Sequence, residues 1–285
     1  MKIRTALLAI AVSGICFAQA PPSYPPPELD RLVQRIALYP DPLLAQVLSA
    51  STFADEIPDA AKWSDQHHYL NGAALANAIT EDQLPWDPSV QALLPFPSVL
   101  TTMAADINWT QQLGNAVLAQ RQDVMDAVQR ERAMAMNYGY LRSGARVVIA
   151  RNGPYITILP VDPAFMYVPY YDPAVVFIAP RPGFAIGTAI NFGFGFNIGV
   201  AFQPWGWGAI RLDWASHGWF IHGAVWGRNW ANRAVYVHNY PGLRRFDRPG
   251  VRPAAVHPEG HKLEERSPKE READRTGGRR EEEHR

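Results

Sequence analysis

The chain has 285 residues, of which 47% are hydrophobic and 19% are charged, and its 27 basic and 27 acidic residues balance to a formal net charge of zero. This length and composition allow one or two domains with a buried core, and the zero net charge gives no electrostatic argument for a nucleic-acid partner. The charges are segregated, because Asp213 is the only acid between Ile178 and Tyr240 whereas both signs are dense after Gly242.

The first twenty residues have the three parts of an export signal. Lys2 supplies a positive start, an apolar run follows over residues 6–17, and Ala18-Gln19-Ala20 fits the small-x-small rule for signal-peptidase cleavage. We therefore expect residues 1–20 to be a signal peptide and the protein to be exported to the periplasm or cell envelope of a bacterium. The single cysteine, Cys16, follows a bulky residue, which disfavours a lipid anchor. Cleavage would leave a mature chain without a thiol or a disulfide.

Residues 21–27, "PPSYPPP", predict an extended proline-rich leader. Residues 28–143 predict a multi-helix domain. Its first helix follows from apolar residues at helical spacing: Leu29, Leu32, Val33, Ile36 and Ala37. The "YPDP" segment predicts that a second helix begins with Asp41 as N-cap and Pro42 at the first helical position, and Asp87-Pro88 repeats this signal. Pro58 predicts that the third helix begins near Ile57.

The longest helix is predicted from Trp109 to about Met136, opened by a capping box of Asn108 and Gln111. Its apolar stripe is formed by Leu113, Val117, Val124 and Val128. Asn137 and Gly139 provide a C-terminal stop. Short proline-containing turns between the helices predict a compact helical array.

Residues 144–180 change from helical to strand periodicity. The segment "ARVVIARNGPYITILPV" predicts a strand, an Asn-Gly turn and a second strand. An internal repeat follows, in which Asp162-Pro163-Ala164 matches Asp172-Pro173-Ala174. We interpret each unit as a turn that leads into a short strand, with the aspartate bonded to its own backbone, in preference to a ligand site built from the two aspartates.

Residues 181–242 form a segment rich in Gly and Trp. Between residues 183 and 202, a large or β-branched side chain occupies every even position and Gly, Ala or Asn lies between. This alternation predicts a β-hairpin with its loop at Gly193-Phe194-Gly195, which pairs Phe192 with Phe196. One face would be apolar and the other nearly free of side chains, so that a backbone or a flat ligand could approach closely. The exposed hairpin edges would also allow self-association.

Six of the nine tryptophans lie in this segment: Trp205, Trp207, Trp214, Trp219, Trp226 and Trp230. Three interpretations are open. The rings could form the core of a module that is otherwise poor in bulk, a stacking surface for glycan strands, or an anchor at a membrane interface. As candidate ligand contacts we take Trp205, Trp207, Trp214, Trp219 and Trp226.

No catalytic, metal-binding or cofactor-binding residues are predicted. His217 and His222 lie five residues apart, which places them on opposite faces of a strand. In "HPEGH", Pro258 and Gly260 disrupt the helix that a zinc motif needs. His67-His68 has no evident nucleophile beside it.

The C-terminal residues 243–285 mix both charge signs and lack aromatic residues after Phe246. This composition predicts a disordered charged tail.

Three segments together resemble the bacterial envelope family known as domain of unknown function 3300. They are "LDRLVQRIALYPDPLLAQVLSAST", the run "PWDPSVQALLPFPSVLTTMAADINWTQQLGNAVLAQRQDVMDAVQ", and "YVPYYDPAVVF" followed by the Gly and Trp-rich stretch. The resemblance covers about residues 28–240. It implies an exported bacterial protein, helical in its first part and rich in Gly and Trp behind, and it carries no family activity or site.

The sequence thus predicts an α+β fold, with an N-terminal multi-helix domain followed by a small Gly/Trp-rich antiparallel β module. For its function we expect a non-catalytic envelope protein that contacts peptidoglycan, the membrane surface or an envelope protein through the Gly/Trp-rich region. Two alternatives are a cell-wall-modifying hydrolase and a self-associating structural subunit.

Overall fold

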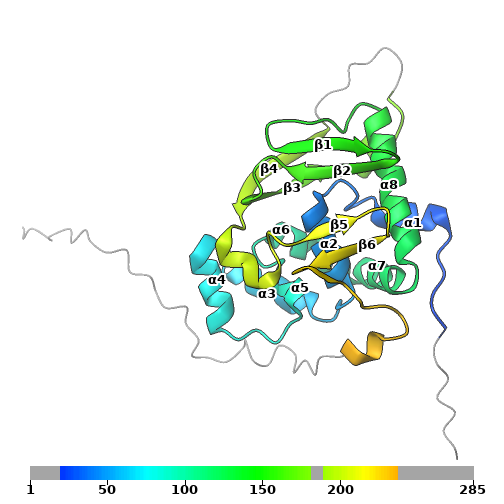
Figure 1. Cartoon of the computed structure of the whole chain (residues 1–285). Helices are drawn as coiled ribbons and strands as arrows, with labels where there is room; N and C mark the ends of the chain where they lie inside the picture. The colour runs from blue at the N-terminus through cyan, green and yellow to red at the C-terminus, as the bar shows by residue number, and fades with distance from the viewer. Residues whose placement is uncertain (1–19, 181–188, 237–285) are drawn as a thin grey trace, which may run out of the picture. The chain divides into compact units, whose positions relative to one another are not determined.

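The computed structural model describes residues 20–180 and 189–236, and within them a helical region is followed by small antiparallel sheets (Figure 1). The predicted α+β fold class is confirmed. All described residues belong to one compact unit. The predicted disordered tail, and all but the last residue of the predicted signal peptide, lie outside the described residues.

Among the described α-helices of the helical region, three begin at a proline residue. The helices of this region are α1 (Pro26–Val33), α2 (Asp41–Ser51), α3 (Ile57–Gln66), α4 (Gly72–Glu81), α5 (Pro88–Gln91), α6 (Pro97–Ala105), α7 (Ile107–Ala119) and α8 (Arg121–Asn137). The predicted start of the third helix at Ile57 is confirmed, as is the cap at Asp87, whose carboxylate accepts a hydrogen bond from Ser89 N at 2.8 Å.

Helix α1 begins earlier and ends earlier than predicted. Pro26 and Pro27 form its first turn, where a missing N–H costs nothing, so the extended leader is shorter than the predicted 21–27. The helix ends at Val33, and Ile36 and Ala37 lie in the following turns, although both side chains are buried as predicted.

Helix α2 lies at the centre of the core. Every residue in it except Pro42 is buried, including Asp41, Gln46 and Ser49. A helix that is buried on all sides must be covered by other elements all round, and the polar side chains on it need partners within the protein. Gly114 of α7 permits one of these contacts, because a Cβ there would lie 2.1 Å from Ser51 O.

The single long helix predicted over residues 109–136 is wrong, since α7 and α8 are separate helices. Gln120 lies between them with φ −138° and ψ 46°, outside the helical region. Its side chain instead holds the leader: Gln120 Oε1 accepts from Tyr24 N at 2.6 Å and Gln120 Nε2 donates to Tyr24 O at 3.3 Å. These long-range bonds give the break a structural role.

The ends and the buried stripe of this helix pair follow the sequence more closely. Leu113, Val117, Val124 and Val128 are all fully buried, as predicted. The cap, however, is Asp106, which accepts from Trp109 N at 3.1 Å, and the predicted capping box at Asn108 is wrong. At the other end α8 stops at Asn137, and Gly139 has a positive φ of 79°.

The described strands form three antiparallel sheets. Strands β1 (Val147–Asn152) and β2 (Tyr155–Pro160) form the predicted hairpin, in which Asn152 pairs with Tyr155 and Gly153 takes φ 62° in the turn. Strand β3 (Phe165–Tyr171) pairs with β4 (Ile190–Asn197). The third sheet has the order β5 (Arg211–Asp213), β6 (Gly218–Ile221) and β7 (Ala224–Val225), and β5 packs against α2 (Figure 1).

Both Asp-Pro units use the predicted turn chemistry. Asp162 Oδ1 accepts from Ala164 N at 2.9 Å, and Asp172 Oδ1 accepts from Ala174 N at 2.8 Å. The first unit leads into β3, but the second leads into a short helix, α9 (Pro173–Val176), where Asp172 acts as N-cap. The prediction of a strand after Asp172 is therefore wrong.

The hairpin predicted within residues 183–202 is also wrong. Residues 193–195, predicted as its loop, lie inside β4, and the strand pairs with β3 along its length. Between Tyr167 and Pro169 the register shifts by one residue on β4, which is a β-bulge. The bulge breaks the predicted alternation, so Ile190 is buried whereas Phe194 is 90% exposed. The part of the prediction on residues 183–188 lies outside the described residues.

After β4 the chain forms a 3-10 helix, η1 (Val200–Trp205), and a second one, η2 (Arg233–Tyr236), follows β7. Across 20–180 and 189–236, no helix has both the length and the apolar character needed to cross a membrane.

Candidate functional site

Four of the five tryptophans chosen as ligand contacts are buried against the helical region. Each directs its indole N–H to an acceptor on or beside α2 and α5. The bonds run from Trp205 to Gln91 Oε1 at 2.9 Å, from Trp207 to Ala92 O at 3.0 Å, from Trp214 to Asp41 Oδ2 at 3.0 Å, and from Trp219 to Ser49 Oγ at 2.9 Å. Trp214 and Trp219 thus satisfy polar groups on the buried helix α2, and Trp205 and Trp207 bond to the last residue of α5 and the residue that follows it.

The interpretation of these four rings as an open stacking surface is therefore wrong, and the core interpretation holds. Trp226 differs, because it is only half-buried and stacks on Trp219 with ring centroids 4.8 Å apart. The guanidinium of Arg121 lies 4.8 Å from the Trp226 ring centroid. A ligand contact at Trp226 stays a prediction.

Asp41 is the acceptor at the centre of this arrangement, and its predicted role as an N-cap is wrong. Its Oδ1 lies 2.6 Å from Arg132 Nη1 and accepts from Ile158 N at 3.3 Å, while Oδ2 accepts from Trp214. Arg132 is fully buried, and its guanidinium also lies 4.8 Å from the Trp214 ring centroid. A buried arginine needs an acidic partner, and the first residue of α2 supplies it.

Glu131, the neighbour of this arginine, is a buried carboxyl with a weak partner. Its oxygens lie 3.4 Å from Gln34 Nε2. Burial is the main cause that raises the pKa of Glu131 from 4.5 to about 7; Asp30 raises it further, and Gln34 and Arg130 oppose the shift. The folded protein therefore binds this proton more tightly than the unfolded chain does.

We expect this group to make stability depend on pH. The raised pKa contributes stability that is complete below about pH 4.5 and is lost as the pH rises through about 7. Glu131→Gln should remove that loss, so the variant should be more stable than the wild type by about 3 kcal/mol at pH 8 and similar to it at pH 4. Urea unfolding at both pH values measures the difference, and an equal effect of the substitution at both would contradict the assignment.

A different surface presents aromatic side chains to solvent. A groove of about 430 Å³ lies between the β3–β4 sheet and the helical region. On the sheet side it is lined by aromatic and proline residues: Pro169, Tyr170, Tyr171, Phe194 and Phe196. We call this the aromatic groove.

Two of its rings are almost entirely exposed, Tyr170 at 83% and Phe194 at 90%. The bulge in β4 turns Phe194 outward, and the adjoining Gly193 and Gly195 leave no neighbouring side chains to cover it. In contrast, Tyr171 is fixed, because its hydroxyl donates to Gln34 O at 2.7 Å.

The opposite wall of the groove is polar. Ser98 and Thr102 of α6 bring hydroxyl groups to it, and Arg35 brings a guanidinium that pairs with Asp106 at 3.0 Å. Thr102 Oγ1 donates to Ser98 O at 2.9 Å. The groove thus combines exposed aromatic faces with hydroxyl groups, which can hold a ligand that has both apolar faces and polar edges.

Tyr170 and Phe194 were not among the site residues predicted from the sequence. The pattern around Phe194 contained a signal, since a large ring between two glycines cannot be packed by its own neighbours. We used the glycines to predict a loop, although they mark a bulge that exposes the ring.

His217 and His67 have structural contacts. His217 Nε2 lies 2.9 Å from Asp126 Oδ1, which joins the β5–β6 turn to α8. His67 stacks on Trp63, with ring centroids 3.9 Å apart. Within the two described ranges, no group of three or more His, Cys, Asp or Glu residues could hold a metal ion.

Comparison with known proteins gives the relationship of the chain. Residues 26–245 match the model of the family described as protein of unknown function DUF3300. The chain belongs to this family. It is also 33% identical over 218 residues to the uncharacterized protein YacH of Escherichia coli strain K12, an alignment that covers 61% of this chain and 35% of YacH. This DUF3300 chain thus spans about a third of the length of that relative. No solved structure matches it.

Proposed function

We propose that the protein is a non-catalytic binding module of the bacterial cell envelope and that it binds glycan strands of peptidoglycan in the aromatic groove. One observation carries the proposal. The exposed rings of Tyr170 and Phe194 line the same groove as the hydroxyl groups of Ser98 and Thr102 on α6. The location in the envelope rests on the export signal predicted over residues 1–20.

The exposed rings favour a partner. An exposed Phe side chain leaves apolar area in water that burial would stabilise by about 2 kcal/mol. Phe194 and Tyr170 line one groove, so a single ligand could cover both.

The chemistry of the two walls favours a saccharide among the envelope components. Sugar rings offer C–H faces that stack on aromatic rings and hydroxyl groups that bond to polar side chains. Tyr170 and Phe194 provide the first kind of contact, and Ser98 and Thr102 provide the second. The binding surface proposed from the sequence thus moves from the tryptophans to the β3–β4 sheet.

Co-sedimentation tests the proposal. The mature chain, residues 21–285, should pellet with purified peptidoglycan, and the double variant Tyr170→Ala/Phe194→Ala should bind at least about tenfold more weakly, a loss of about 1.4 kcal/mol. Both rings are exposed, so the variant should keep the wild-type unfolding temperature within a few degrees.

The matched control is Tyr69→Ala, which removes an exposed aromatic ring outside the groove and should leave binding unchanged. Full binding by the double variant would show that another surface binds the glycan. Pelleting with lipid vesicles in place of peptidoglycan would support a membrane partner, and a mass that rises with concentration would support the self-associating subunit.

A further inference from the structure

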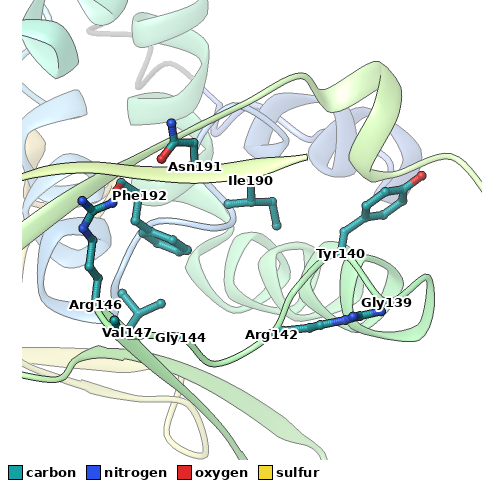
Figure 2. A pocket seen from close by; sticks show the side chains of 10 residues that line it. Gly139, Tyr140, Arg142, Gly144, Arg146, Val147, Ile190, Asn191 and Phe192 are labelled. Carbon is teal, nitrogen blue, oxygen red and sulfur yellow. Dashed lines mark hydrogen bonds between the residues drawn. The ribbon is translucent and has the colours of Figure 1, made fainter. Parts of the chain in front are cut away.

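A second cavity lies beside the first residues of β4, Ile190, Asn191 and Phe192. It has a volume of about 470 Å³ and is formed by the segment that follows α8, residues 139–147, and by the first residues of β4 (Figure 2). None of its lining residues lines the aromatic groove. It therefore offers an independent site.

Apolar side chains line the middle of this cavity. Ile190 and Phe192 point from β4 toward the 139–147 segment, and Val147 lies below Phe192 (Figure 2). Asn191 points to the opposite side of the strand. An apolar body of a ligand could pack between the strand and the segment.

The charged groups of the wall are all positive. Arg142 and Arg146 line the cavity, and among the residues that the structure describes no Asp or Glu does. The surrounding sequence has the same bias, since no acid lies between Glu131 and Asp162 whereas Arg142, Arg146 and Arg151 do. An anion in the cavity would meet no nearby carboxylate in its wall.

The two guanidiniums still have donors to offer. Arg146 Nη1 donates to Phe192 O, which holds the side chain across the cavity, and within the described part of the chain the Arg146 side chain forms no other hydrogen bond (Figure 2). Arg142 forms neither a hydrogen bond nor an ion pair with any described residue. A guanidinium carries five N–H donors in a fork that matches carboxylate and phosphate oxygens.

We propose that this cavity binds an organic anion, a molecule that joins a carboxylate or a phosphate group to an apolar portion. Arg146 binds the anionic group, Ile190, Phe192 and Val147 contact the apolar portion, and Arg142 adds positive charge at the mouth. The volume of about 470 Å³ fits a small molecule.

Isothermal titration calorimetry on the mature chain tests the assignment with four probes. Phenyl phosphate and benzoate carry both parts of the proposed ligand, whereas inorganic phosphate lacks the apolar part and benzyl alcohol lacks the charge. We expect saturable binding of at least one aryl anion, and at least about tenfold weaker binding of the two incomplete probes. The stronger of phenyl phosphate and benzoate identifies the anionic group.

Three arginine variants separate the site from general charge. Arg146→Gln and Arg142→Gln should each weaken the aryl anion at least about fivefold. Arg151→Gln removes the same charge from β1 outside the cavity and should leave binding within about twofold. If Arg146→Gln does not fold, Arg142→Gln alone still tests the proposed site, because it breaks no hydrogen bond or ion pair among the described residues. Equal losses in all three variants, or no saturable binding of either aryl anion, would overturn the proposal.

Discussion

Arg132→Met should lower the free energy of unfolding by about 3–5 kcal/mol. The substitution removes the guanidinium that lies 2.6 Å from Asp41 and leaves that carboxylate buried without its cationic partner. It also removes the donors to Ala37 O at 2.8 Å, Tyr39 O at 2.9 Å and Ile156 O at 2.8 Å. Two of these carbonyls belong to the helical region and the third belongs to β2, so the loss of the three hydrogen bonds should destabilise the helical region and the β1–β2 sheet together. Urea unfolding at pH 7 measures it.

Arg130→Met is the matched control on the same helix. Arg130 pairs with Asp30 at 2.6 Å, but both side chains are partly exposed, so its loss should cost no more than about 1 kcal/mol. The double variant Asp41→Asn/Arg132→Met should be more stable than Arg132→Met alone, since it leaves no buried charge. If Arg132→Met lowered the free energy of unfolding no more than Arg130→Met does, the Asp41–Arg132 pair would contribute little to stability.

Gly114→Ala should lower the free energy of unfolding by about 3 kcal/mol. In an exposed helix the same change stabilises by about 1 kcal/mol, because alanine has the better helix propensity. Here a Cβ would lie 2.1 Å from Ser51 O and 2.7 Å from Ser51 C, and backbone atoms cannot turn aside as a side chain can. Helices α7 and α2 would have to move apart. Thermal and urea unfolding measure the effect.

Gly144→Ala is the control for this substitution, since no atom lies within 4 Å of its added Cβ and its φ is not positive. It should change stability by less than about 0.5 kcal/mol. Stabilisation by Gly114→Ala would mean that α7 and α2 do not pack as closely as the structure places them.

The features that were predicted correctly depend on local signals. The Asp87 cap, the helix start at Ile57 and the β1–β2 hairpin each follow from a few neighbouring residues with fixed backbone preferences. Hydrophobic periodicity also located the buried stripe that includes Val117. Fold class could therefore be obtained from the sequence.

The features that were missed depend on partners far away in the chain. Gln120 breaks a continuous helical pattern because its side chain bonds Tyr24, 96 residues earlier. Asp41 has the sequence context of a cap, but Arg132, 91 residues later, takes its carboxylate. The segment that forms β4 was predicted to fold back on itself as a hairpin. Its alternating pattern does not show that its true partner is β3, a different segment of the chain.

The candidate site was missed for a related reason. Trp composition indicates large rings but does not tell whether they are covered; Trp219 is buried against Ser49 of α2, and Trp207 is buried against Ala92 and Phe96. Conversely, the exposure of Phe194 follows from a bulge whose position depends on the pairing of two strands. Neither property is encoded in a short window of sequence.

The bonds between the tryptophans and α2 have a consequence for the order in which the fold can form. Trp219 reaches Ser49 across 170 positions, and Arg228 Nη1 donates to Thr52 O across 176. As the chain emerges from its N-terminus, α5 and α7 can cover only part of α2 until residues near 228 are available, and closing such long loops is slow. The helical segment 28–143 should therefore not mature as an early folding unit. A chain that completes its core last would stay unfolded, and able to pass through a secretion channel, until almost all of it has been made.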